Sequence, residues 1–116
     1  MNRRYIDTGQ TITRGTAFPL VLTLPFDLTG WTVTFTMRAS IADLGTPILQ
    51  CSDDDASHME VDAGTVTVTL ADTDTWKIPE KAENVFIQLN LSQAGSHKAT
   101  EIYSFAVLPN IMEVTP

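Results

Sequence analysis

The sequence is short of the residues that cross-link a chain or ligate metals. Its 116 residues include one cysteine and two histidines. Cys51 has no second cysteine to pair with, so an internal disulfide is excluded and synthesis in a reducing cytoplasm is expected. A chain of this length buries enough apolar surface to fold as one domain without disulfides or metals.

Long apolar runs are also missing. The most apolar stretch, residues 18–26, is interrupted by Thr23 and contains Pro19 and Pro25, whereas a spanning helix needs about 18 or more consecutive apolar residues. Arg3 and Arg4 lie near the start, but no apolar segment follows them. The sequence therefore predicts neither a membrane span nor a secretory signal.

Positive charge is scarce, with 7 lysines and arginines against 14 acidic residues and a net charge of -7. Nucleic acids and anionic membranes both require a basic surface, so neither is expected as a partner. The charge is unevenly spread: Arg3, Arg4 and Arg14 are opposed only by Asp7, whereas residues 43–62 are acidic and lack any basic residue. This polarity suits either solvated loops or head-to-tail guidance of subunits.

Several segments of the sequence show apolar residues alternating with polar ones. In residues 31–38, apolar side chains (Trp31, Val33, Phe35 and Met37) alternate with threonines and end at Arg38. Side chains of a strand point to opposite faces in turn, so this is a half-buried strand with one solvated face. The same period recurs in residues 65–70, 85–91 and 98–108. These segments predict the centre of a sheet protein.

Shorter strands and turns fill the gaps. Strands are expected at residues 10–14, 47–51 and 58–61, and a final segment at 111–114. Residues 18–24 carry a proline, which lacks a backbone donor, so they predict an edge strand or a strand that changes sheets. Turns are expected at 27–30, 62–64 and 93–96, where glycine accompanies aspartate, alanine or serine.

Residues 71–78 differ, because they suit a single turn of helix before Pro79. We expect Asp72 to cap it, Asp74 to be exposed, and Trp76 and Ile78 to plug one end of the sheets. Together the segments predict an all-β fold, an immunoglobulin-like antiparallel β-sandwich of seven to nine short strands with one short helical turn. Residues 1–9 are expected to form an N-terminal arm and 10–116 a single sandwich domain.

Candidate catalytic groups are few. Cys51 and His58 carry no protease signature, and His97 lies beside an expected turn. Asp72 and Asp74 could form a two-carboxylate pair, although capping of the helical turn explains Asp72 more simply. No phosphate-binding loop, dinucleotide fingerprint or Cys-x-x-Cys motif is present. We therefore expect a protein that is not an enzyme and has no cofactor.

The acidic loop and the outward aromatics are the remaining candidates. Three consecutive aspartates at 53–55, with His58 nearby, lack the spacing of a calcium loop, and ion binding there is left open. Trp76 is either an end plug or a stacking platform for a ligand. Phe86 falls on the outward face of its strand beside Gln88 and Asn90, which is typical of a partner surface.

One stretch carries a family resemblance. Residues 27–38 (DLTGWTVTFTMR) resemble the turn and first central strand of small β-sandwich structural proteins of tailed bacteriophages and prophages, in particular the N-terminal domain of phage upper baseplate proteins. Residues 64–70 (GTVTVTL), 71–76 (ADTDTW), 85–91 and 113–115 follow in a similar order. This sequence has ENVF at residues 83–86 where the family has a Gly-x-Tyr lead-in. We expect a single domain with no fibre or receptor-binding part of its own.

The resemblance implies a non-enzymatic virion protein of the tail, baseplate or head–tail junction, made in the bacterial host cytoplasm. Its partners would be other phage structural proteins and further copies of the chain, joined through strand edges or the N-terminal arm. The candidate partner contacts are Arg3, Arg4, Tyr5, Ile6 and Phe86. The alternative is a carbohydrate-binding or adhesin-like sandwich that uses Trp76 and the acidic loop, with or without calcium.

Overall fold

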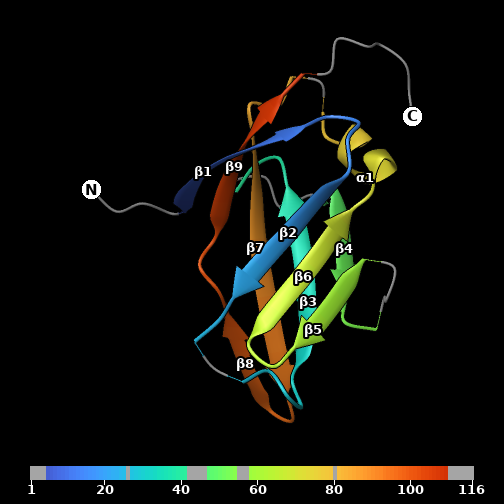
Figure 1. Ribbon diagram of the computed structural model, residues 1–116. Helices are drawn as coiled ribbons and strands as arrows, with labels where there is room; N and C mark the ends of the chain where they lie inside the picture. The colour runs from blue at the N-terminus through green and yellow to red at the C-terminus, as the bar shows by residue number, and fades with distance from the viewer. Residues whose placement is uncertain (1–4, 26, 42–46, 55–57, 80, 110–116) are drawn as a thin grey trace.

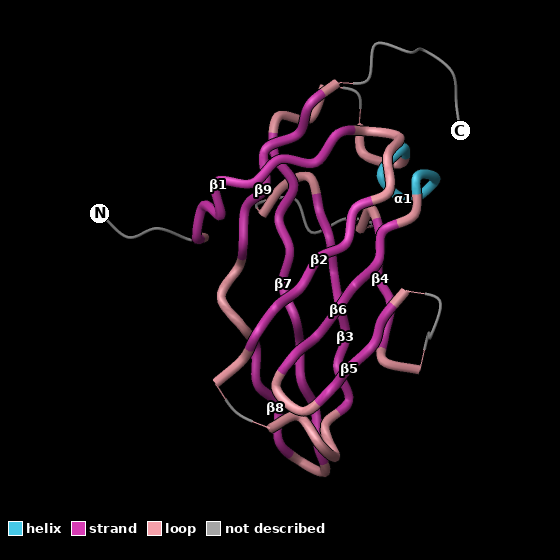
Figure 2. The backbone as a smooth tube through the Cα atoms, in the orientation of Figure 1, coloured by secondary structure: helices cyan, strands magenta, loops and turns pink. Residues whose placement is uncertain are grey.

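The chain folds into two β-sheets packed face to face, with one short helix at an end of the sandwich (Figures 1 and 2). This computed structural model describes residues 5–25, 27–41, 47–54, 58–79 and 81–109. Within these residues the strands are β1 (Ile6–Thr13), β2 (Phe18–Thr23), β3 (Thr32–Arg38), β4 (Leu49–Ser52), β5 (Met59–Asp62), β6 (Thr65–Leu70), β7 (Asn84–Gln93), β8 (Ser96–Ala99) and β9 (Tyr103–Leu108), and the helix is α1 (Asp72–Trp76). The all-β prediction is confirmed. No helix among the residues described here is long or apolar enough to cross a membrane.

The larger sheet has six strands in the order β1-β9-β7-β3-β4, with β8 also paired to β7. The smaller sheet has the order β2-β6-β5. Because β3 pairs along one edge of β7, strands β8 and β9 follow one another along its other edge. The prediction of one returning strand over 98–108 is therefore wrong. Thr100 interrupts it, and its hydroxyl accepts a hydrogen bond from the Leu89 amide (3.1 Å).

The core lies between the sheets and follows the predicted alternation. Val33, Phe35 and Met37 of β3 are completely buried, and Phe35 lies opposite the buried Leu89 of β7. The facing strand β6 buries Val66, Val68 and Leu70 and exposes its threonines to differing degrees. Burial of each such side chain contributes about 1.5–3 kcal/mol, so these alternating positions account for the packing of the two sheets.

The sandwich has two open sides. On one side lie β1, at the edge of the larger sheet, and β2, at the edge of the smaller sheet; on the other lie β4 and β5 (Figure 1). We call these the β1/β2 side and the β4/β5 side. The prediction for residues 18–24 is confirmed, because β2 is an edge strand and the chain changes sheets just before it. Phe18 of β2 meets Phe105 of β9 edge to face, with 6.0 Å between ring centroids.

The start of the chain differs from the prediction in two ways. Strand β1 begins at Ile6 rather than Gln10, so residues 6–9 of the expected arm belong to the sheet. Strand β1 also pairs with β9 in parallel, so the larger sheet is not wholly antiparallel. The register shifts between Asp7 and Thr11, where Gly9 has a φ of +70°, a backbone conformation that glycine adopts readily, so the regular pairing of β1 is interrupted there. The segment expected at 111–114 lies outside the described residues.

Helix α1 begins differently from the sequence prediction. Ala71 is the N-cap residue, and the carboxylate that accepts a hydrogen bond from its amide belongs to Asp74 (2.9 Å), not Asp72. Asp72 accepts only from the amide of Thr73. The prediction of an exposed Asp74 is wrong, because only 5% of this residue is accessible. The reason is that α1 folds against the end of the sandwich, where Ile78 is completely buried, as expected of the plug.

Candidate functional site

The candidate catalytic and metal groups are dispersed. No group of three or more histidine, cysteine or acidic side chains that could hold a metal ion occurs in the part of the chain that the structure describes. Cys51 is buried in the core, whereas the Nε2 atom of His58 lies 2.8 Å from Asp74. Asp53 accepts a hydrogen bond from the Val33 amide (3.3 Å). Of the three loop aspartates, Asp55 lies outside the described residues.

Trp76 faces a cation. The guanidinium carbon of Arg14 lies 4.6 Å from the centre of the Trp76 ring, and Arg14 also donates hydrogen bonds to the carbonyl oxygens of Trp76 (3.3 Å) and Ile78 (2.7 Å). This arrangement fixes the start of the sheet-changing connection to the end of α1. It also covers one face of the indole ring, which leaves less of that ring for stacking on a ligand.

The N-terminal candidates meet Phe86 on the outer face of the larger sheet. The rings of Tyr5 and Phe86 lie edge to face, with 5.1 Å between centroids. Ile6 donates its amide to the carbonyl of Ile102 (2.7 Å), and its side chain is 45% exposed. Arg3 and Arg4 lie outside the described residues. Tyr5 is thus anchored on its own chain, beside the point where residues 1–4 join the fold.

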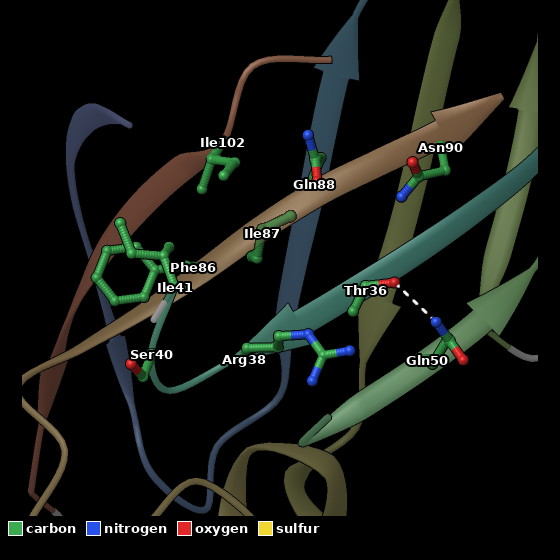
Figure 3. A pocket seen from close by; sticks show the side chains of 10 residues that line it. All are labelled: Thr36, Arg38, Ser40, Ile41, Gln50, Phe86, Ile87, Gln88, Asn90 and Ile102. Atoms are coloured by element: carbon green, nitrogen blue, oxygen red, sulfur yellow. Dashed lines mark hydrogen bonds between the residues drawn. The ribbon is translucent and has the colours of Figure 1, made fainter. Parts of the chain in front are cut away.

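Phe86 also lines a hollow of about 270 Å³ on this outer face (Figure 3). The hollow lies over the central strands β3 and β7. Its lining residues are Thr36, Arg38, Ser40, Ile41, Gln50, Phe86, Ile87, Gln88, Asn90 and Ile102. Phe86, Ile41 and Ile102 lie at one end, and the polar side chains of Gln50 and Asn90 lie toward the other, so the hollow has an apolar half and a polar half.

Two amides in the polar half are held in place by hydrogen bonds. The Nε2 atom of Gln50 donates to the hydroxyl of Thr36 (3.0 Å), and that of Gln88 donates to the carbonyl of Thr100 (2.9 Å). Each bond uses one of the two N–H groups of its amide, so the second N–H and the amide oxygen can bind a further partner. The sequence marked Gln88 and Asn90 only as outward residues. It gave no sign of Gln50, which reaches the hollow from the adjacent strand β4 through its pairing with Thr36.

The backbone edges of the smaller sheet are a second candidate surface. The amide of Leu24 donates to the carbonyl of Gly64 (2.7 Å), so every second residue of β2, counted back from Leu24, directs its backbone groups toward β6. The residues between them direct their backbone groups away from β6, where no further strand pairs within the described chain. Pro19 has no donor, which leaves Val21 and Thr23 as the donors of this edge.

The same reasoning applies to β5. The amide of Thr69 donates to the carbonyl of His58 (2.7 Å), so Met59 and Val61 direct their backbone groups away from β6. Glu60 and Asp62 are exposed on this strand. Charged side chains on an edge strand oppose pairing with a like-charged edge. Two copies of β5 are therefore poorly suited to pair with each other.

The Asp27 carboxyl has a lowered pKa, and its hydrogen bonds stabilise a turn. The hydroxyl and the amide of Thr29 both donate to Asp27 (2.7 and 2.9 Å), and these bonds lower the pKa of the Asp27 carboxyl below its ordinary value of 3.8. Asp27 is fully exposed. The predicted turn at 27–30 is thereby confirmed, with Gly30 at a φ of +85°.

Neither the protein-family models nor the curated proteins searched contain a match to this chain. The fold itself defines the class as an all-β sandwich with a hollow on its outer face.

Proposed function

We propose that this protein is a non-enzymatic structural or assembly component, of the kind found in the virions of tailed bacteriophages, and that it acts through protein–protein contacts. The observation that carries the proposal is where the exposed apolar side chains lie. Within the residues described, the large hydrophobic side chains that are exposed are Ile6 (45%), Val21 (59%) and Leu108 (47%). All three belong to the β1/β2 side or to its neighbour β9.

These side chains accompany strand edges that are open in the isolated chain. Val21 lies on β2, at the position that also presents an unpaired backbone donor. Ile6 and Leu108 lie at opposite ends of the parallel β1–β9 pair, where Leu108 is opposite Thr13. Apolar side chains beside an open edge suit the addition of a strand or loop from another subunit, in which backbone bonds supply affinity and side chains supply specificity.

Charge supplies an orientation for such contacts. Arg3 and Arg4 precede β1 in the sequence, while Asp53, Asp54, Glu60 and Asp62 are exposed on the β4/β5 side. Opposite charge on opposite sides favours head-to-tail association and disfavours contact between like sides. Arg14 does not belong to this basic surface, because it is engaged with α1.

Sedimentation velocity over a concentration series tests self-association. Deletion of residues 1–4 removes Arg3 and Arg4 but keeps β1, whereas a deletion of 1–9 would remove half of that strand. We expect weaker association for this deletion and for Val21→Ser, which removes the apolar side chain without adding charge, and association that weakens with salt. Thr69→Ser, on the exposed face of the central strand β6, is the matched control. Unchanged association in both variants would contradict the assembly mechanism.

The virion part of the proposal has its own test. Mass spectrometry of purified phage particles from the source strain should detect the chain, and the neighbouring genes should encode head or tail proteins. Detection only in the soluble cell fraction, with unrelated neighbouring genes, would leave an assembly protein without a virion role. The earlier alternative, a glycan platform at Trp76 with the acidic loop, is less favoured, because Arg14 covers one face of the indole.

A further inference from the structure

We infer that the hollow on the outer face of the larger sheet binds a neutral saccharide unit. This inference concerns a different surface from the strand edges and does not depend on the assembly role. The hollow combines one aromatic ring, Phe86, with a set of amide side chains, Gln50, Gln88 and Asn90, and one cation, Arg38. Each of these features restricts the chemistry of the ligand.

The position of the hollow argues against a peptide strand. It lies over β3 and β7, which are interior strands of the sheet with partners along both edges. Their backbone groups are already used in the ladders, so a ligand here cannot add as a further strand. Recognition must come from side chains, over a volume of about 270 Å³. That volume suits a small ligand of one or two rings.

The hydrogen-bonding groups favour hydroxyls. One N–H of each amide of Gln50 and Gln88 is bonded within the protein, which holds the side chain in place, so these residues present an oxygen and a second N–H at fixed positions. The exposed amide of Asn90 offers both a donor and an acceptor. A hydroxyl donates and accepts at the same time, so adjacent sugar hydroxyls can satisfy acceptor and donor together.

The remaining features disfavour anionic ligands and place the sugar ring. The chain has a net charge of -7, which opposes the approach of a carboxylate or phosphate, and the lining of the hollow includes one cationic side chain, Arg38. At the apolar end, Phe86 is braced by the ring of Tyr5 and offers a surface for the C–H face of a sugar. A neutral saccharide, with an apolar face and a polar rim, therefore matches both halves of the hollow.

The test is an amide-detected NMR titration of the full chain with a matched series of probes. Glucose, galactose, mannose, rhamnose and N-acetylglucosamine are the neutral members, and glucuronate and glucosamine are the charged counterparts of glucose and its derivatives. We expect saturable shifts at β3 and β7 around the hollow with at least one neutral sugar. Glucuronate should bind more weakly than glucose, and glucosamine more weakly than N-acetylglucosamine.

Variants locate the binding and keep the test decisive. Asn90→Ala and Gln50→Ala should each weaken the affinity by about tenfold, the effect of one lost hydrogen bond to a ligand. Thr32→Ala, on the same face of β3 but outside the hollow, should bind like the parent protein. Thermal melting of each variant shows that the fold is retained.

Several results would overturn the inference. These are no saturable shift with any neutral probe, shifts centred on Trp76 instead of the hollow, tighter binding of glucuronate than glucose, or equal affinity in Asn90→Ala, Gln50→Ala and Thr32→Ala. None of these results bears on self-association, which sedimentation measures separately. The saccharide inference and the assembly proposal can therefore fail independently.

Discussion

The two open sides of the sandwich have opposite surfaces. The β1/β2 side exposes Ile6 and Val21, and Arg3 and Arg4 precede β1 in the sequence. The β4/β5 side instead exposes acidic side chains, with Glu60 and Asp62 on its edge strand. The β1/β2 side can make apolar contacts, whereas the acidic β4/β5 side can attract a basic surface and repel a second copy of itself. The two sides of this sandwich therefore differ in the partners that they can bind, and we predict pairing between unlike sides.

Both sides are joined to the same helix, but by different chemistry. From the β1/β2 side, Arg14 bonds to the carbonyls of Trp76 and Ile78, and the hydroxyl of Thr75 donates to Thr16 (2.7 Å). From the β4/β5 side, His58 meets the buried carboxylate of Asp74. Helix α1 is thus held by partly exposed bonds on one side and by a buried carboxylate on the other.

The largest expected effect is on the buried attachment. Asp74→Ala removes the acceptor of the Ala71 amide and the partner of His58, and we expect a loss of about 2–4 kcal/mol in the free energy of unfolding. Asp74→Asn keeps an acceptor at the helix start and should lose less. Urea unfolding followed by tryptophan fluorescence measures both, with Asp72→Ala as the control at an exposed position. Equal losses for Asp72→Ala and Asp74→Ala would contradict the assigned capping role.

A smaller loss is expected on the other attachment. Arg14→Ala removes two hydrogen bonds to carbonyls and the contact with the Trp76 ring, and because this group is partly exposed we expect a cost of about 1–2 kcal/mol. Arg14→Lys keeps the charge but not the planar set of donors. If Arg14→Lys were as stable as the parent in the same urea experiment, the guanidinium geometry would be irrelevant. We expect Asp74→Ala to have a lower free energy of unfolding than Arg14→Ala. This order would show that the buried attachment of α1 contributes more than the partly exposed one.

Reversing the charge of the β4/β5 side should weaken self-association without unfolding the protein. Glu60→Lys with Asp62→Lys changes exposed side chains of β5, so the free energy of unfolding should change by no more than about 0.5 kcal/mol. Head-to-tail pairing should weaken by about tenfold or more in sedimentation velocity at low salt. Adding Arg3→Glu and Arg4→Glu should restore part of the loss. Failure of this second exchange to restore association would argue against contact between the arm and β5.

Prediction from sequence succeeded where structure depends on local alternation. The period of two located β6 at residues 65–70 and marked Val33, Phe35 and Met37 as buried. It could not find the parallel β1–β9 pair, because Ile6 meets Tyr103 through a contact between distant parts of the chain. Local periodicity contains no information on such pairing.

The burial of Asp74 and the hollow were not predicted from the sequence, for a related reason. In residues 72–76 (DTDTW) two aspartates look equally solvated, and only the approach of His58 and the fold of α1 distinguish the buried one. The hollow gathers polar residues from β3, β4 and β7, each of which, taken singly, is an ordinary outward side chain. Sites that depend on several strands become visible only when the register is known.

The smallest expected effect concerns the turn that leads from β2 on one side to β3 in the middle of the larger sheet. The turn also joins the β4/β5 side, since the amide of Leu28 donates to Ala63 beyond β5 (2.9 Å). The bonds from Thr29 lower the pKa of Asp27, so this carboxylate stabilises the fold above its unfolded pKa of about 3.9.

That contribution should disappear as the pH falls through the lowered pKa of the folded state. Asp27→Asn keeps an acceptor but has no titrating group, so its melting temperature should fall slightly below that of the parent near neutral pH. The two melting temperatures should converge in strong acid. Because Asp27 is fully exposed, water and salt screen the effect, and it should be smaller than the effect at either attachment of α1. A difference that persisted unchanged in acid would mean that the mutation acts through the turn geometry and not through the charge.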